Sequence, residues 1–393
     1  MQDRRGAWCE AALTAVLFAL PPLLALASRG AAALATVAGL AAAGLVAARP
    51  PLRLRRLTLP GLLLALLVAW GAASAAWSLI PGHSLALAFR VLALFAAALA
   101  LAASAAAAQR PERLLVALLA GGALGIALAA IDFASGGVLS SALYTRPYRP
   151  AELNQITAAV AILTLPAAAA LWCHEARVAA IATLAAGLAT VALLVDDSAK
   201  AGLILALPVA GLVWWRRGAA ARGFATLSAV AIMTVPWTLP RLAGWPHLFA
   251  AAKAFRLSLA HRLLIWAFAG AHIIERPGAG WGLDASRAIP GGKVEVIAGG
   301  TAMPLHPHDA ALQVWLELGV PGAVLFAGFV ALLWRRIADA DWPPLYAAAA
   351  AGSLTAALAV AFSAYGIWQE WWLGTLALCA FAVLALGRTA TDS

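Results

Sequence analysis

Residues 84–107 read SLALAFRVLALFAAALALAASAAA and hold one charged side chain, Arg90. A helix of this length can cross the roughly 30 Å hydrocarbon core of a bilayer. Further apolar runs of spanning length lie near 8–28, 30–48, 60–80, 112–133, 152–173, 177–195, 198–215, 221–240, 310–334, 343–363 and 367–387. We therefore predict an all-α, polytopic membrane protein with about twelve transmembrane helices, forming one integral membrane domain over residues 1–393.

The amino-acid composition is typical of an integral membrane protein. Hydrophobic residues make up 64% of the sequence and charged residues 11%, and the mean hydropathy is +0.89. These values exclude an ordinary soluble globular protein. Cys9, Cys173 and Cys379 lie in apolar stretches without a CxxC spacing, so they indicate neither a disulfide framework nor a zinc site.

The positive charges gather at the ends of the apolar runs, which explains the net charge of +10 without a nucleic-acid partner. If both termini are cytoplasmic, the short outward loops hold only Arg29, Arg146, Arg149 and Lys200. The inward ends and loops then hold Arg4, Arg5, Arg49, Arg53, Arg55, Arg56, Arg110, Arg113, Arg177, Arg216, Arg217, Arg222, Arg335, Arg336 and Arg388. This asymmetry predicts an N-in, C-in topology.

Residues 241–309 depart from this pattern, because they are outward on the same count and yet strongly basic. Long loops are largely exempt from the positive-inside rule, so the topology stands and this segment becomes one large periplasmic loop. Its excess of cations predicts an anionic partner. The basic residues are Arg241, Lys253, Arg256, Arg262, Arg276, Arg287 and Lys293.

Within this loop, SLAHRLLIWAFAGAHIIE at 258–275 predicts an amphipathic helix. Arg262, Trp266, Ala269 and Ile273 share one face at helical spacing, and the turn PGAGWG at 277–282 ends the helix. One interpretation is a helix at the membrane interface, with the tryptophan at the headgroups and the arginine extended to water. The other is that this face belongs to a functional site.

The next segment, PLHPHDAALQVWLELGVPG at 304–322, predicts a helix that starts at Ala310 with Asp309 as its N-cap. Gly319 is the expected C-cap. His308 then lies at the positive end of the helix dipole, which predicts a neutral imidazole able to accept a proton. A solvated loop histidine is the alternative. His306, His308 and Asp309 also resemble a metal site, but Pro307 and the lack of a further ligand at suitable spacing count against it.

Three more places carry candidate binding residues. Arg90 is costly within a span, so we expect it to face the protein interior or a wet cavity, with extension to an interface as the alternative. Arg146 and Arg149 belong to the outward loop TRPYRPAELNQ, and Lys200 to DDSAKAG at 196–202. Solvated loops would explain both segments equally well, but they share one side of the membrane with the large loop.

Several of these motifs resemble the O-antigen ligase and O-antigen polymerase superfamily of bacterial membrane glycosyltransferases. The resemblance rests on Arg262 with Trp266 and PGAGWG, on the histidine, capped helix and E-x-G end of 304–322, and on SAYGIWQEWW at 363–372. Asp309 stands where the family commonly has Asn. Lys200 and Gln155 stand near family arginines, so bidentate recognition of a phosphate is weakened there.

The resemblance implies a GT-C-like fold in the bacterial inner membrane and metal-independent transfer without a cofactor. The expected donor is a glycan on undecaprenyl diphosphate, and the expected acceptor is a lipid A-core hydroxyl at the periplasmic face. His308 and Arg262 are the predicted catalytic residues, and Lys200, Arg90, Arg149, Arg146, Trp266 and Asp309 are the predicted substrate-binding residues. A polymerase that extends the growing glycan on the same donor is the alternative. A secondary transporter is a further alternative, which the absence of repeated halves in the sequence disfavours.

Overall fold

The computed structural model describes residues 2–50, 57–144 and 147–391. Within these ranges the chain is almost entirely helical, and the strands form one small antiparallel hairpin. Eleven of the described helices are long and apolar enough to cross a membrane. The predicted all-α polytopic fold is thereby confirmed.

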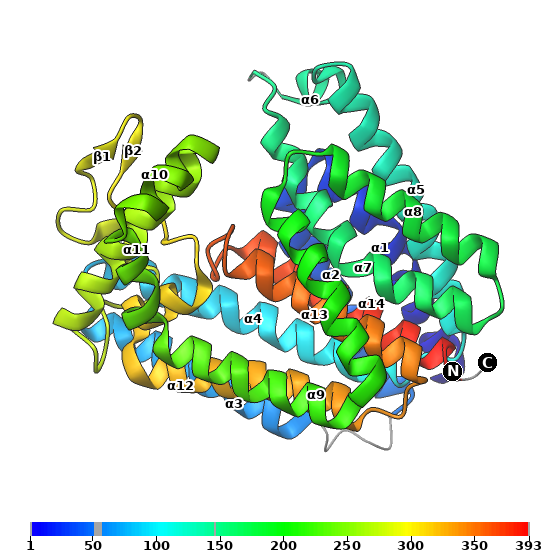
Figure 1. The fold of residues 1–393 in the computed structure, drawn as a ribbon. Helices are drawn as coiled ribbons and strands as arrows, with labels where there is room; N and C mark the ends of the chain where they lie inside the picture. Colours follow the sequence, from blue (N-terminus) through cyan, green and yellow to red (C-terminus); the bar gives the residue numbers. More distant parts are fainter. Residues whose placement is uncertain (1, 51–56, 145–146, 392–393) are drawn as a thin grey trace.

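The N-terminal half is a series of long helices joined by short turns (Figure 1). Its elements are α1 (Gln2–Leu26), η1 (Ser28–Gly30), α2 (Ala31–Ala48), α3 (Thr58–Ala73), η3 (Ser74–Ala76), α4 (Pro81–Ala105), α5 (Pro111–Ala134), α6 (Val138–Leu143), η4 (Pro150–Leu153), α7 (Asn154–Cys173) and α8 (Arg177–Leu193).

The C-terminal half contains the predicted large loop and the last long helices. Its elements are α9 (Asp197–Ala243), α10 (Pro246–Phe255), α11 (Leu257–Glu275), η5 (Ala285–Ala288), β1 (Glu295–Ile297), β2 (Gly300–Thr301), α12 (Ala310–Asp339), α13 (Pro344–Ala361) and α14 (Glu370–Thr389).

The helix count differs from the prediction at three places. α9 joins the two spans predicted at 198–215 and 221–240, with non-helical backbone at Arg216, so it bends into two arms (Figure 1). α8 has 17 residues and is about 26 Å long, which is short for a full crossing. α11, predicted as part of the loop, is apolar and long enough to count among the eleven.

Small residues let several helix pairs approach closely, as is usual in membrane bundles. A Cβ on Gly121 of α5 would lie 2.2 Å from the carbonyl oxygen of Phe18 in α1. A Cβ on Gly187 of α8 would lie 2.1 Å from Thr164 Oγ1 in α7. α5 is therefore held against α1, and α8 against α7.

Both chain ends lie on one face of the bundle, at the lower right of Figure 1. There Glu10 pairs with Arg49 at 2.8 Å and accepts a hydrogen bond from the backbone N–H of Arg110 at 2.6 Å. Arg388 donates to the carbonyl of Ala108 at 3.0 Å, and Arg217 at the bend of α9 donates to the carbonyl of Trp342 at 3.0 Å. Segments predicted to be cytoplasmic thus meet on a shared face.

Candidate functional site

The glycine-rich turn after α11 is anchored to a break in α12. The Gly282 N–H donates to the Glu317 carbonyl at 2.8 Å, and the Val320 N–H donates to the Pro277 carbonyl at 2.9 Å. Gly319 has φ +60° and ψ −158°, a conformation that favours glycine. The prediction that the helix ends at Gly319 is therefore wrong: the helix is interrupted at Gly319, and α12 continues to Asp339.

Glu317 connects three separate segments through its carboxylate, which is fully buried. It accepts hydrogen bonds from the Asp284 N–H at 2.7 Å, from Ser286 Oγ at 2.5 Å, from Gln313 Nε2 at 3.1 Å and from Trp368 Nε1 at 2.5 Å. These donors come from the loop after PGAGWG, from α12 itself and from the segment between α13 and α14. The last segment is thereby fixed against the start of α12.

His308 lies immediately before the Asp309 cap, in left-handed backbone with φ +56°. Its Nδ1 is 2.6 Å from the carbonyl oxygen of Ala364. A carbonyl can only accept, so Nδ1 carries the hydrogen and Nε2 carries the lone pair. Among the described residues, Nε2 has no hydrogen-bond partner.

Both histidines of the HPH segment are neutral near pH 7. Burial lowers the pKa of His308 to about 4, with a further lowering from Arg262. Burial also lowers the pKa of His306 to about 3, with the neighbouring His308 as the next cause. The neutral state matches the expectation from sequence, but its main cause is desolvation, whereas the sequence argument invoked the helix dipole.

Arg262 and Trp266 place α11 beside the histidines. Trp266 Nε1 donates to the carbonyl of Pro307 at 3.1 Å, and Ala269 and Ile273 on the same helix face are buried. The α11 face that carries Trp266, Ala269 and Ile273 therefore packs against the rest of the protein. Arg262, one turn before Trp266, is only partly exposed and forms no hydrogen bond or ion pair with any described residue. Its guanidinium fork is available to a ligand.

Asp196, the first residue of the DDSAKAG segment, also belongs to this cluster, although it was not among the predicted site residues. Its Oδ1 caps α9 by accepting from the N–H groups of Ser198 at 3.0 Å and Ala199 at 3.1 Å. Its buried Oδ2 has no partner among the described residues, and neither does the buried hydroxyl of Tyr365. Burial raises the pKa of Asp196 to about 6, and the positive charge of Arg262 opposes that shift.

Asp309 forms the predicted N-cap of α12, with Oδ1 accepting from the Leu312 N–H at 2.8 Å. Its side chain is directed at the first turn of its own helix and is buried. Burial raises its pKa to about 7. In this structure the residue therefore serves as a cap.

The other predicted binding residues are spread over several places. Arg90 Nε pairs with Glu370 Oε1 at 2.8 Å, at the start of α14. Lys200 is partly exposed in the first turn of α9, close in sequence to Asp196. Arg149 is exposed before η4, and no hydrogen bond or ion pair of the described residues joins it to the histidines. Arg146 lies outside the described residues.

The assembled cluster combines a proton acceptor with a free cation. Nε2 of His308 can accept a proton, and the fork of Arg262 can bind phosphate oxygens in a bidentate manner. Within the described ranges, no three His, Cys, Asp or Glu side chains are grouped as a metal site requires.

Sequence reasoning missed several residues that support this site. Glu317 was noted only as part of an E-x-G pattern, although a carboxylate inside an apolar run is itself a signal for a buried network. The Ala364 carbonyl could not be found from side-chain identity. Asp196 was not named as a candidate, because the sequence shows it only as the first of two adjacent carboxylates in DDSAKAG.

Comparison with known proteins supports the resemblance to the O-antigen ligase superfamily. Residues 182–327 match the family model described as O-Antigen ligase. The chain is 36% identical over 122 residues to the "Putative polysaccharide ligase" of Rickettsia conorii, covering 30% of this chain and 29% of that protein. A like-named protein of Rickettsia prowazekii is 35% identical over 122 residues, with the same shares of the two chains. The matches thus span less than a third of these relatives' length.

The matched segment contains Arg262, His308 and Glu317, the residues around which the cluster is built. The resemblance to the O-antigen ligase superfamily that the motifs predicted is thereby confirmed over residues 182–327, the part of the chain that the family model matches.

Proposed function

We propose that this protein is a ligase-type glycosyltransferase, which moves a glycan from undecaprenyl diphosphate to a hydroxyl of lipid A-core. The observation that carries the proposal is the hydrogen bond from His308 Nδ1 to the Ala364 carbonyl, 2.6 Å long. This bond leaves Nε2 as the basic nitrogen, in the same cluster as the free guanidinium of Arg262. The family match and the names of the relatives support the ligase-type assignment.

In the proposed reaction, the acceptor hydroxyl attacks the anomeric carbon of the donor glycan. A new carbon–oxygen bond forms, and the hydroxyl proton moves to Nε2 of His308. The bond between the anomeric carbon and the diphosphate breaks, and the diphosphate leaves with the electron pair. The proton then passes from His308 to solvent or to the diphosphate, which restores the neutral imidazole.

Arg262 stabilises the negative charge that develops on the leaving diphosphate. A preorganised cation at a partly buried site does this better than one in water, because the local dielectric is lower. Lys200 at the start of α9 is the second cation we assign to the diphosphate, while Arg90 acts through its pair with Glu370. Arg146 and Arg149 remain proposed contacts to the glycan or diphosphate, and Trp266 a proposed sugar platform.

We place the reaction at the periplasmic face of the bacterial inner membrane. Arg49, Arg110, Arg217 and Arg388 gather on the face that carries the termini. The positive-inside rule assigns that face to the cytoplasm. The start of α12, with His308, lies at the other end of a helix whose last turn approaches Arg217.

The test uses purified protein in nanodiscs, with a synthetic glycan on undecaprenyl diphosphate and with lipid A-core as acceptor. His308→Ala should lower the transfer rate by about a hundredfold to ten-thousandfold, the usual value of general-base assistance. His247→Ala, at an exposed histidine of α10, is the matched control and should be unaffected. Near-normal transfer by a folded His308→Ala protein would overturn the mechanism.

A second arm concerns Arg262 and the acceptor. Arg262→Lys should transfer poorly because lysine lacks the planar fork, whereas Arg241→Lys, at an exposed arginine, should behave as wild type. Glycan recovered on lipid A-core supports a ligase. Longer glycan on the undecaprenyl carrier alone would identify a polymerase instead.

A further inference from the structure

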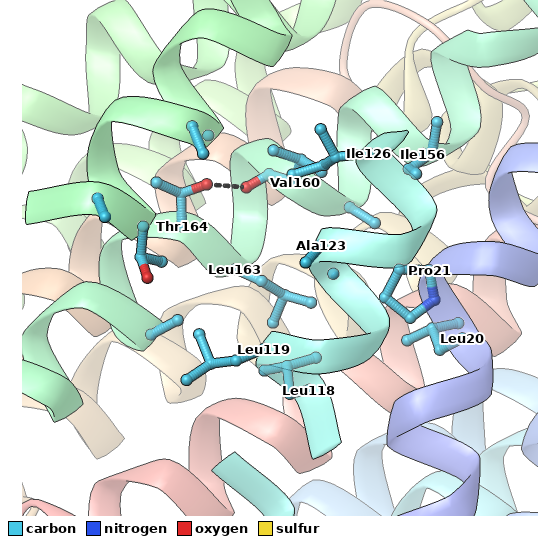
Figure 2. A pocket seen from close by; sticks show the side chains of 17 residues that line it. Leu20, Pro21, Leu118, Leu119, Ala123, Ile126, Ile156, Val160, Leu163 and Thr164 are labelled. Carbon is cyan, nitrogen blue, oxygen red and sulfur yellow. Dashed lines mark hydrogen bonds between the residues drawn. The ribbon is translucent and has the colours of Figure 1, made fainter. Parts of the chain in front are cut away.

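An apolar groove lies between α1, α5, α7 and α8 (Figure 2). None of the described residues that line it is charged, and the hydroxyl of Thr164 is already bonded to the carbonyl of Val160 at 2.7 Å. A diphosphate needs cationic hydrogen-bond donors, which this groove does not offer. The loop between α11 and α12, by contrast, holds three cations: Arg276, Arg287 and Lys293.

These three cations differ in what they contact. The guanidinium of Arg276 lies over the ring of Trp281, 4.0 Å from its centroid. Lys293 is exposed and donates to a backbone carbonyl at 3.3 Å. Arg287 Nη2 lies 2.5 Å from Asp284 Oδ2. Within the described part of the chain, Arg287 is thus the cation of this loop that a buried carboxylate orients.

Asp284 is itself fixed at several points. Its backbone is left-handed, with φ +57°, and its N–H donates to Glu317 Oε2 at 2.7 Å. Its Oδ2 is 2.7 Å from His83 Nε2, in the first turn of α4. A carboxylate can only accept, so His83 Nε2 carries the hydrogen. The carboxylate therefore cannot turn without losing these contacts, and it holds Arg287 Nη2 in place.

Glu317 also holds the segment that carries Arg287 against the segment between α13 and α14. Ser286, the residue before Arg287, donates from Oγ to Glu317 Oε1 at 2.5 Å. Trp368 Nε1 donates to Oε2 of the same carboxylate at 2.5 Å. One fully buried side chain thus fixes the backbone next to Arg287 relative to Trp368.

Arg287 and Arg262 act on the same imidazole. Gln369 follows Trp368, and its Nε2 lies 3.4 Å from His306 Nε2. The positive charges of Arg287 and Arg262 both contribute to the low pKa of His306, so both lie within electrostatic range of that ring. Arg262 belongs to α11 and Arg287 to the loop after it, so two guanidinium groups reach the site from different segments.

Arg287 keeps hydrogen-bonding capacity for a ligand. A guanidinium has five N–H donors, and the contact to Asp284 is at Nη2. The Nε of Arg287 is buried and has no partner among the described residues, which is costly for a polar group. The side chain is nevertheless 37% exposed, so a ligand can reach it.

We propose that Arg287 binds the diphosphate of the undecaprenyl donor together with Arg262, and that Asp284 is the positioning residue that holds its guanidinium. The identity of the anion rests on the proposed function. Each planar guanidinium can take two phosphate oxygens, so two arginines match the two phosphate groups of the donor. Arg287 thereby adds to the stabilisation of the leaving diphosphate.

The test is binding of undecaprenyl diphosphate, without glycan or acceptor, to the full-length protein in phosphatidylcholine nanodiscs. Arg287→Gln should raise Kd by about tenfold, the effect of losing a charged hydrogen-bond donor. Wild type should prefer the diphosphate to undecaprenyl monophosphate, and Arg287→Gln should lose most of that preference. A purely structural role would weaken the binding of both lipids equally. Arg241→Gln, at an exposed arginine of α9, is the matched control and should bind as wild type.

Two further variants separate binding from folding. Arg287→Lys keeps the positive charge beside Asp284 but lacks the planar fork, so it should fold as wild type and recover only part of the affinity. Asp284→Asn keeps Arg287 but weakens its anchor, so its Kd should lie between those of wild type and Arg287→Gln. Wild-type affinity in Asp284→Asn would overturn the positioning role.

The transfer assay identifies which substrate Arg287 contacts. Arg287→Gln should raise KM for the donor and leave KM for lipid A-core unchanged. A rise in KM for lipid A-core alone would assign Arg287 to the phosphates of the acceptor and overturn the inference. Failure of wild type to bind undecaprenyl diphosphate would overturn the proposed function, whereas equal binding by wild type and Arg287→Gln would overturn the role of Arg287 alone.

Discussion

His308 is a weak base in the resting protein, because burial lowers its pKa to about 4. The imidazole is the free base above that pH and gains a proton below it. We therefore expect kcat/KM for transfer to fall on the acid side near pH 4, well below the 6.5 of an unperturbed histidine. Asp196, with a pKa of about 6, could add a second step.

The measurement is a pH profile of transfer for wild type and for Asp196→Asn. In Asp196→Asn the limb near pH 4 should remain, while any inflection near pH 6 disappears. A half-maximal rate near pH 6.5 in that variant would show that His308 is solvated during the reaction.

Asp309 predicts a pH-dependent stability. Burial raises its pKa from 3.8 to about 7, so the folded state holds the proton more tightly than the unfolded state does. Its contribution is favourable at low pH and is lost as the pH rises towards 7 and above. Asn caps a helix as well as Asp and carries no charge. Asp309→Asn should therefore raise Tm at pH 8 and leave it nearly unchanged at pH 4.

The check is thermal unfolding of both proteins in detergent at the two pH values. An equal shift at both would show that the carboxylate charge is not the cause.

Among the structural elements, the break in α12 depends on Gly319. A Cβ there would lie 2.6 Å from the Gly278 carbonyl oxygen, and its φ of +60° is costly for other residues. Gly319→Ala should destabilise the protein by about 2 kcal/mol or more and disturb the turn at 277–282. Gly223→Ala, in helix with nothing within 4 Å, is the control and should be neutral or mildly stabilising.

The two variants are compared by thermal unfolding and by the yield of folded protein. Equal stability of Gly319→Ala and wild type would mean that the turn and α12 can separate at little cost.

Sequence predicted the elements well where one physical signal dominates. Long apolar runs such as 84–107 became helices, and Asp309 became a cap, because bilayer length and unpaired N–H groups leave few alternatives. The bend at Arg216 was not predicted, because two arginines between two apolar runs are as typical of a loop as of a bend within one long helix. α11 was found, but its packing against protein could not be distinguished from a position at the interface.

The site was predictable only in part, because its members are far apart in sequence. Arg262 and His308 could be named from motifs, but the contact between Glu317 and Trp368 joins residues 51 positions apart. Such pairings follow from how helices pack, which one sequence does not specify. Asp196 enters the cluster for the same reason.

At the scale of the whole molecule, the shared face of both termini predicts a labelling pattern. In a variant with Cys9, Cys173 and Cys379 replaced, Val294→Cys lies in the large loop and should react with a membrane-impermeant maleimide from the periplasm. Glu112→Cys, exposed at the start of α5, should react only after the inner membrane is opened. The reverse pattern would invert the proposed topology and move the candidate site to the cytoplasm.

The acceptor that orients the His308 imidazole is the peptide carbonyl of residue 364, and the side chain there is already a methyl group. Every amino acid has a backbone carbonyl oxygen, so this hydrogen bond depends on the number of residues in the segment 362–369 and not on which residue stands at position 364. Alanine scanning therefore cannot detect this hydrogen bond. Single-residue insertions and deletions in this segment are the changes that reveal it.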